Sequence, residues 1–106
     1  MVWVTAQAGR DPGHGELVPG GAEGQLNQAI DNLAAILEDC NSSLDRVIRT
    51  QIMYTDPDDA DVIDSVYARR FHPPLPVRTM WGVKFLAAEP GSEVVRVQID
   101  CVAETT

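Results

Sequence analysis

The chain has 106 residues, a length that fits one domain over 1–106 and leaves no room for two. Its net charge is −8 at pH 7 and no cluster of Lys or Arg offsets that charge locally, which argues against a nucleic-acid partner and an anionic membrane surface. No apolar run approaches the ~20 residues of a membrane span. The N-terminus carries no basic-then-apolar signal, so we expect a cytoplasmic protein. The net charge does not exclude a small anionic ligand, because one well-placed arginine can hold one carboxylate.

The first part of the chain predicts a strand, a glycine-rich loop and a long helix. Residues 2–7 alternate and contain β-branched and aromatic side chains, as a strand does. Residues 9–24 contain six glycines and two prolines and predict a loop, with room for a short strand at 16–18. From about 22 to 40 the apolar spacing is helical, and Asn41 is expected to end the helix. The apolar stripe of this helix comprises Leu26, Ala29, Ile30, Leu33, Ile36, Leu37 and Cys40.

The middle of the chain predicts a second strand followed by a second helix. Residues 47–55 form the strand, with Ile52 among the apolar residues of one face. Asp56 can cap a helix and Pro57 suits the first helical position, so the helix should continue from there to about residue 71. Two helices are enough to cover one face of a sheet.

The last part of the chain predicts a hairpin of two strands, 77–86 and 94–102, joined by a turn around Pro90-Gly91. The other face of the sheet is either exposed to solvent or packed on another subunit. The apolar side chains on that face favour partial burial against a partner. That face should carry Arg78, Met80, Gly82, Lys84, Val94, Arg96, Gln98, Asp100 and Val102. The rows that should meet the helices are Val77, Thr79, Trp81, Val83 and Phe85 in the first strand, and Val95, Val97, Ile99 and Cys101 in the second.

The cysteines and histidines do not predict a metal site. Cys40 and Cys101 fall on predicted buried faces and outside any C-x-x-C, so we interpret both as reduced core thiols. His14 and His72 have no Cys, His or Asp partner at ligand spacing and are expected to be ordinary surface or packing residues.

Five segments, taken in order, are similar to motifs of the Rid family (reactive intermediate deaminase, also called YjgF). The segments are VWVTAQAGRDPGHGELV, QLNQAIDNLAAIL, DRVIRTQIMYTD, VIDSVYARRF and LPVRTMWGVKFL. The resemblance implies a chorismate-mutase-like α+β fold, a mixed sheet with two helices on one face, and a homotrimer with a cleft between each pair of subunits. It implies hydrolysis of enamines and imines of the 2-aminoacrylate type to 2-keto acids and ammonia, without a metal or organic cofactor. The partner it implies is a small carboxylate ligand.

The resemblance also implies roles for individual residues. Arg78 matches the arginine that pairs with the substrate carboxylate, and a planar guanidinium suits that task. Met80 matches the position whose backbone groups touch the ligand. The family's cleft glutamate aligns with Gln98, which can orient a water but cannot exchange a proton with it near neutral pH. Asp100, two residues along, is a candidate substitute for the glutamate.

Two further departures from the family pattern bear on function. Asp64 stands where active deaminases carry asparagine, and a carboxylate near the cleft would repel an anionic substrate; we favour a solvated helix carboxylate. Family members also usually begin earlier, with a strand bearing a cleft tyrosine that has no counterpart in this sequence, so either that segment is absent or the chain is a shortened product. Three functions stay open: an imine or enamine deaminase, a non-catalytic trimeric binder of small carboxylates such as 2-keto acids, and a ribonuclease or translation inhibitor, which the net charge disfavours.

Overall fold

The computed structural model describes residues 1–86 and 94–106 of the chain, so the expected turn around Pro90-Gly91 lies outside the described residues. Within those residues, no helix has the length and apolar character needed to cross a membrane. The elements are β1 (Val2–Ala8), α1 (Gly21–Asp39), the 3-10 turn η1 (Leu44–Arg46), β2 (Val47–Tyr54), the 3-10 turn η2 (Pro57–Asp59), α2 (Ala60–Arg70), β3 (Val77–Gly82) and β4 (Val97–Ala103).

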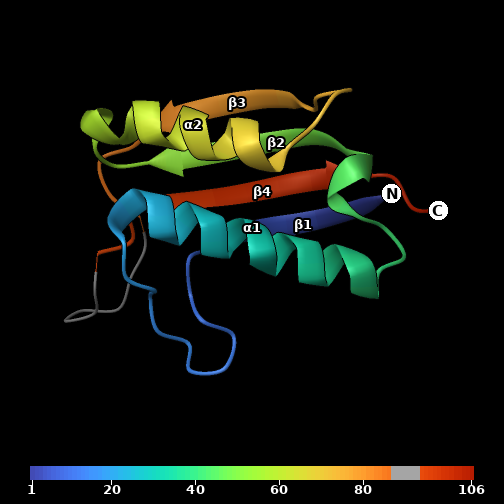
Figure 1. Ribbon diagram of the computed structural model, residues 1–106, viewed down its shortest axis with the longest axis horizontal. Coiled ribbons are helices and arrows are strands. Elements are labelled where there is room, and N and C mark those ends of the chain that lie inside the picture. Colours follow the sequence, from blue (N-terminus) through green and yellow to red (C-terminus); the bar gives the residue numbers. More distant parts are fainter. Residues whose placement is uncertain (87–93) are drawn as a thin grey trace.

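The four strands form one mixed sheet in the order β1-β4-β2-β3 (Figure 1). β4 runs antiparallel to both β1 and β2, and β3 runs parallel to β2. Parallel neighbours need a crossover connection, and α2 supplies it between β2 and β3. The described part of the chain is therefore a mixed α+β fold, as the sequence predicts.

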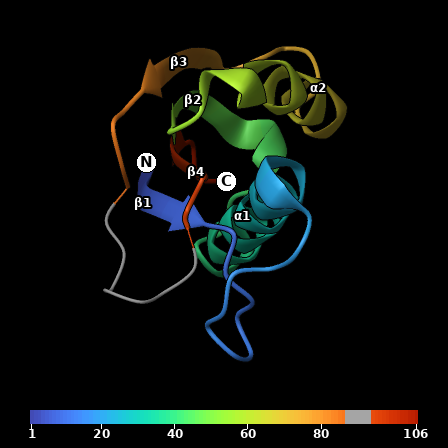
Figure 2. The same ribbon diagram turned by 90° about the vertical axis from the view of Figure 1, so that its left-hand side faces the viewer.

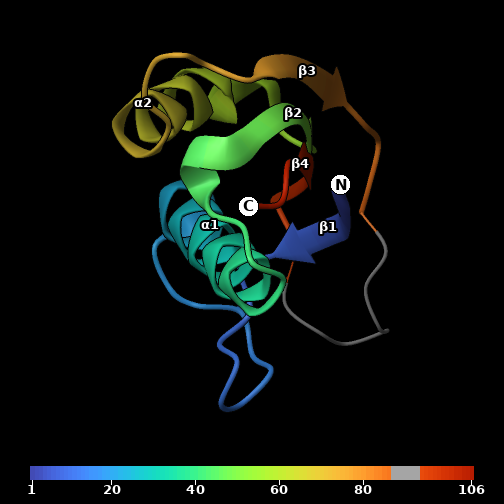
Figure 3. The same ribbon diagram turned by 90° about the vertical axis from the view of Figure 1, so that its right-hand side faces the viewer.

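Both helices cover the same face of the sheet (Figures 2 and 3). α1 lies against β1 and β4, and α2 lies beside α1 and covers the β2 and β3 side. The core between the two layers is built from fully buried aliphatic side chains, each stabilising the fold by roughly 1.5–3 kcal/mol relative to exposure. Its largest fully buried aliphatic members are Leu26, Ile30, Leu33, Leu37, Ile52, Ile63, Val66, Val97 and Ile99.

Helix α1 ends where the sequence predicts, but one residue of the predicted stripe falls outside it. Asn41 adopts a left-handed conformation with φ of 60°, and the Asn41 and Ser42 amides donate to the carbonyls of Glu38 and Leu37. These two bonds satisfy carbonyls at the helix end in the manner of a Schellman motif. Cys40 stands at this turn and is exposed, so its predicted burial was wrong. Cys101, on the helix-facing side of β4, is buried as predicted.

The start of α2 is held by the acidic run that precedes it. Asp56 accepts a hydrogen bond from the Asp58 amide at 2.9 Å, and Pro57 occupies the first turn, as predicted. The buried carboxylate of Asp59 accepts two hydrogen bonds from Arg96, from Nε at 2.9 Å and Nη2 at 3.0 Å. This forked pair ties the start of α2 to the segment before β4.

The predicted hairpin between the last two strands was wrong. β3 and β4 are not neighbours, because β2 lies between them and pairs with both. Both strands are also shorter than predicted, covering Val77–Gly82 and Val97–Ala103. The parallel crossover through α2 places β3 on the outer edge of the sheet, on the far side of β2 from β4. The two strands are close in sequence but cannot pair as a hairpin in this position.

The predicted orientation of β3 was also wrong. Its register pairs Arg78 with Thr50 and Met80 with Ile52, and paired residues share a face. Thr50 and Ile52 are buried beneath the helices, so Arg78 and Met80 face the helices as well. The other row faces away from the helices, with Val77 exposed to 68% and Trp81 to 52%. In β4 the predicted burial of Val97, Ile99 and Cys101 is confirmed.

Because only one cysteine is exposed, we expect native protein to react with iodoacetamide at Cys40 alone. Burial raises the pKa of the Cys101 thiol to about 11, so that sulfur stays protonated and unreactive near pH 8. Intact-mass spectrometry should show one adduct per native chain and two after unfolding in urea. Fast modification of Cys101 in native protein would contradict the placement of β4.

Candidate functional site

A pocket of about 410 Å³ opens between α2 and the start of β3. Its wall is mostly apolar, and its charged side chains are Asp64 from α2 and Arg78 from β3. The short connection after α2 forms the rest of the rim. The lining residues are Asp64, Tyr67, Ala68, Phe71, His72, Pro73, Leu75, Pro76 and Arg78.

Arg78 is held between an aromatic ring and a carboxylate. Its guanidinium carbon lies 4.7 Å from the centre of the Tyr67 ring, a cation–π contact. Its Nη2 lies 2.9 Å from Oδ1 of Asp64. The Arg78 side chain is 30% exposed and that of Asp64 is 54% exposed, so the pair is open to solvent and ligand on one side. Asp64 is therefore not simply a solvated carboxylate, the interpretation favoured from the sequence.

Tyr67 gives the arginine a rigid platform. Its hydroxyl lies 2.8 Å from Oγ1 of buried Thr50, and its ring stacks on Phe71 with centres 4.4 Å apart. Burial raises the pKa of Tyr67, while the Thr50 hydrogen bond and the Arg78 charge oppose the rise. The phenol therefore stays protonated and neutral near pH 7. It can hold a cation against its ring, but it does not supply a negatively charged base.

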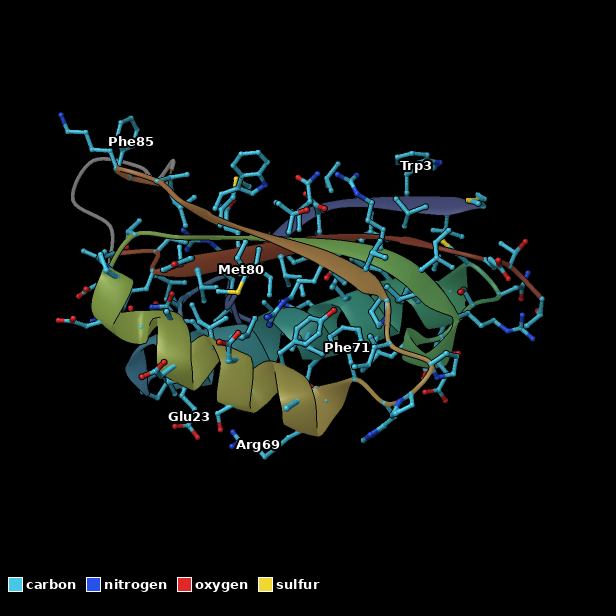
Figure 4. All side chains as sticks on the ribbon, turned by 90° about the horizontal axis from the view of Figure 1, so that it is seen from above. Trp3, Glu23, Arg69, Phe71, Met80 and Phe85 are labelled. Atoms are coloured by element: carbon cyan, nitrogen blue, oxygen red, sulfur yellow. The ribbon has the colours of Figure 1, made fainter. Side chains whose placement is uncertain are left out.

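Met80 lies two residues beyond Arg78 on the same face of β3. Its side chain is half-buried and packs against the core, between the sheet and the helices (Figure 4). β3 pairs only with β2 among the described residues, so it is an edge strand. The backbone groups along its outer edge are therefore not engaged by another strand of the described sheet.

Gln98 and Asp100 lie on the opposite face of the sheet from Arg78. Gln98 pairs in register with Met53, and Asp100 with Gln51. Asp100 lines a second pocket of about 260 Å³ with Trp3, Arg49 and Val102, on the face that Figure 4 shows turned away from the helices. Burial raises the pKa of Asp100, and Arg49 partly offsets the rise. The five predicted site residues therefore divide into two groups within one chain.

Sequence reasoning missed most of the residues around Arg78. Tyr67 was not among the predicted site residues, and it is both buried and part of the pocket wall. Thr50 was not singled out, although a hydroxyl on the buried face of a strand needs a partner, and Tyr67 is that partner. His72 has no metal partners: the described stretches 1–86 and 94–106 contain no group of three His, Cys, Asp or Glu arranged to hold a metal.

Comparison with known proteins identifies the family. The family model Endoribonuclease L-PSP matches residues 1–105. The chain is 32% identical over 102 residues to the 2-iminobutanoate/2-iminopropanoate deaminase of Mus musculus, a match that covers 96% of this chain and 72% of the mouse protein. The chain belongs to the Rid family.

Other Rid proteins agree with this assignment. The chain is 33% identical over 104 residues to the RutC family protein UK114 of Drosophila melanogaster, covering 98% of this chain and 72% of that protein. It is also similar to the crystal structure of RidA from an Antarctic Psychrobacter, with a TM-score of 0.85 and 29% identity, covering 95% of this chain and 77% of the other. The resemblance drawn from the five sequence motifs is thereby confirmed.

Proposed function

We propose that this Rid protein is an imine and enamine deaminase that hydrolyses 2-imino and 2-enamino acids of the 2-aminoacrylate type to 2-keto acids and ammonia. The observation that carries the proposal is the Arg78 guanidinium, held on Tyr67 at the mouth of a pocket with apolar walls. The similarity to the mouse deaminase, over 96% of this chain, supports the same chemistry.

In this mechanism Arg78 binds the substrate carboxylate and fixes the C=N group beside the edge of β3. A water oxygen attacks the C=N carbon, and the π electron pair takes a proton at nitrogen to give a carbinolamine. The hydroxyl proton then moves to nitrogen while the C–N bond breaks, giving the keto acid and ammonia. Holding the reactants in place supplies most of the acceleration.

We infer that the active form is a homotrimer with clefts between subunits. The sheet face opposite the helices carries exposed apolar side chains, with Trp3 at 74% and Val77 at 68%, as an interface does. Within one chain, Gln98 and Asp100 lie on that face, away from Arg78. In the proposed trimer these residues reach the Arg78 pocket of a neighbouring subunit, where Gln98 or Asp100 places the attacking water and the backbone at Met80 orients the amino group.

A second candidate is a trimeric binder of small carboxylates that does not catalyse. Gln98 cannot act as a general base near neutral pH. Asp64 already contacts one nitrogen of the Arg78 guanidinium. A ribonuclease is less well supported, although the family model is named for that activity, because the chain carries a net charge of −8.

The test of the proposed function is release of keto acid from 2-aminoacrylate generated in situ, measured with and without purified wild-type protein. We expect release faster than the buffer rate and proportional to protein concentration. The oligomeric state is measured on the same sample by light scattering. A trimeric sample that leaves the buffer rate unchanged would exclude deamination of this substrate and favour the binder, for which 2-keto acids are then titrated.

A further inference from the structure

We propose that Asp64 and Arg78 together recognise a zwitterion, so that the site selects ligands bearing a cationic nitrogen next to a carboxylate over simple carboxylate anions. Arg78 takes the carboxylate, and Asp64 accepts a hydrogen bond from the nitrogen, which the backbone at Met80 orients. For catalysis the inference rests on the proposed function, and it names the protonated form of the substrate as the one bound.

The two charged groups lie close enough together for one small ligand to contact both. Asp64 Oδ1 and Arg78 Nη2 are 2.9 Å apart, and both residues line the same pocket. In a 2-imino or 2-amino acid the nitrogen and the carboxylate are joined through a single carbon. A ligand that small can therefore bridge two adjacent protein charges of opposite sign.

The contact leaves both groups able to bind. Arg78 meets Asp64 through Nη2, whereas a guanidinium offers five N–H donors over three nitrogens. The Asp64 side chain is 54% exposed and has a second carboxylate oxygen beyond Oδ1. A ligand can thus add its carboxylate to Arg78 and its N–H groups to Asp64 without first separating the pair.

Charge balance makes the site selective. The Asp64–Arg78 pair is neutral overall, so an added anion gains from Arg78 but is repelled by Asp64 at nearly the same distance. A zwitterion carries no net charge and meets each protein group with its opposite. The guanidinium carbon also lies 4.7 Å from the centre of the Tyr67 ring, a cation–π contact that favours the position of Arg78 beside Asp64.

The same arrangement would assist the proposed reaction. Asp64 favours the protonated C=NH₂⁺ group, whose carbon is more electrophilic than that of the neutral imine. Water adds to that carbon as the π electron pair moves to nitrogen, and one water proton passes to nitrogen. The C–N bond then breaks as the second water proton passes to the departing ammonia, giving the keto acid and ammonium. The remaining keto acid is a simple anion that Asp64 repels, so the residue would also favour product release.

The test compares L-alanine, a stable zwitterion, with pyruvate, an anion of the same carbon skeleton, by isothermal titration calorimetry at pH 7. For wild type we expect L-alanine to bind more tightly than pyruvate. In Asp64→Asn, which keeps the side-chain shape, the ratio of the two affinities should move toward pyruvate by roughly tenfold, the effect of losing one charge-assisted hydrogen bond. Asp61→Asn, an exposed aspartate on the same helix, is the matched control and should leave the ratio unchanged.

Each outcome decides the inference separately from the deaminase proposal. An equal ratio in wild type and Asp64→Asn, or no binding of either ligand to wild type at millimolar concentration, would overturn zwitterion recognition. If the ratio of the L-alanine and pyruvate affinities depends on Asp64 but the protein does not hydrolyse 2-aminoacrylate, zwitterion recognition is supported and the deaminase proposal is rejected. Thermal unfolding of all three proteins checks that the fold is unchanged in the two variants, as we expect for the half-exposed Asp64.

Discussion

Replacement of Arg78 by alanine is expected to lower kcat/KM for 2-aminoacrylate hydrolysis by about 100-fold, which corresponds to ~2.7 kcal/mol of lost transition-state binding. The substitution removes the proposed carboxylate anchor and also leaves Asp64 without the cation that now lies 2.9 Å away. An unbalanced aspartate at the pocket would repel the anionic end of the substrate, which adds to the loss. Keto-acid release at subsaturating substrate measures the effect.

Two controls separate the anchor from indirect effects. Arg69→Ala removes an arginine of α2 that pairs with Glu23 on the outer surface of the helices (Figure 4), and it should leave activity unchanged. The double variant Arg78→Ala/Asp64→Asn removes the unbalanced charge and should recover only part of the loss. Retention of wild-type kcat/KM in folded, trimeric Arg78→Ala would refute the proposed role of Arg78.

Replacement of Gly9 by alanine is expected to reduce the free energy of unfolding by about 3 kcal/mol. Gly9 directly follows β1, where the chain passes against α1. A Cβ atom there would lie 2.4 Å from both the Cα and the carbonyl oxygen of Gln25, closer than such atoms approach one another. Both contacts are with backbone, so relief requires the strand and the helix to move apart. Urea unfolding at one fixed protomer concentration measures the change.

The matched control for Gly9 is Gly82 at the end of β3. No described atom lies within 4 Å of a Cβ built there, and the residue is exposed. Gly82→Ala should therefore be neutral or stabilise the protein by up to ~1 kcal/mol, because it restricts the unfolded chain. If both variants unfold at the same urea concentration, the close approach of β1 to α1 is not as described.

The candidate site could be predicted from sequence only in part. The family resemblance pointed to Arg78 and put Asp64 near the cleft, but nothing in the sequence predicted contact between them, because that contact depends on how α2 and β3 pack together. Gln98 and Asp100 were predicted on the same side as Arg78 and lie on the opposite face. Their assignment to one cleft now depends on the proposed trimer.

What the sequence determined by itself is local. Apolar spacing of 3.6 residues located α1, the Asp56-Pro57 pair located the start of α2, Asn41 marked the end of α1, and alternation located the buried row of β4. Each of these depends on interactions within a few residues of the chain, such as a capping hydrogen bond or a repeat that matches the helical period.

What only the tertiary structure decided is which strands are neighbours and which face of β3 meets the helices. Alternation separates the Arg78 and Met80 row from the Val77 and Trp81 row, but it is symmetric, so either row can face inward. The choice follows from parallel pairing with β2, which aligns Arg78 with buried Thr50. That pairing depends on contacts distant in sequence, and it is what places Arg78 over Tyr67 and beside Asp64.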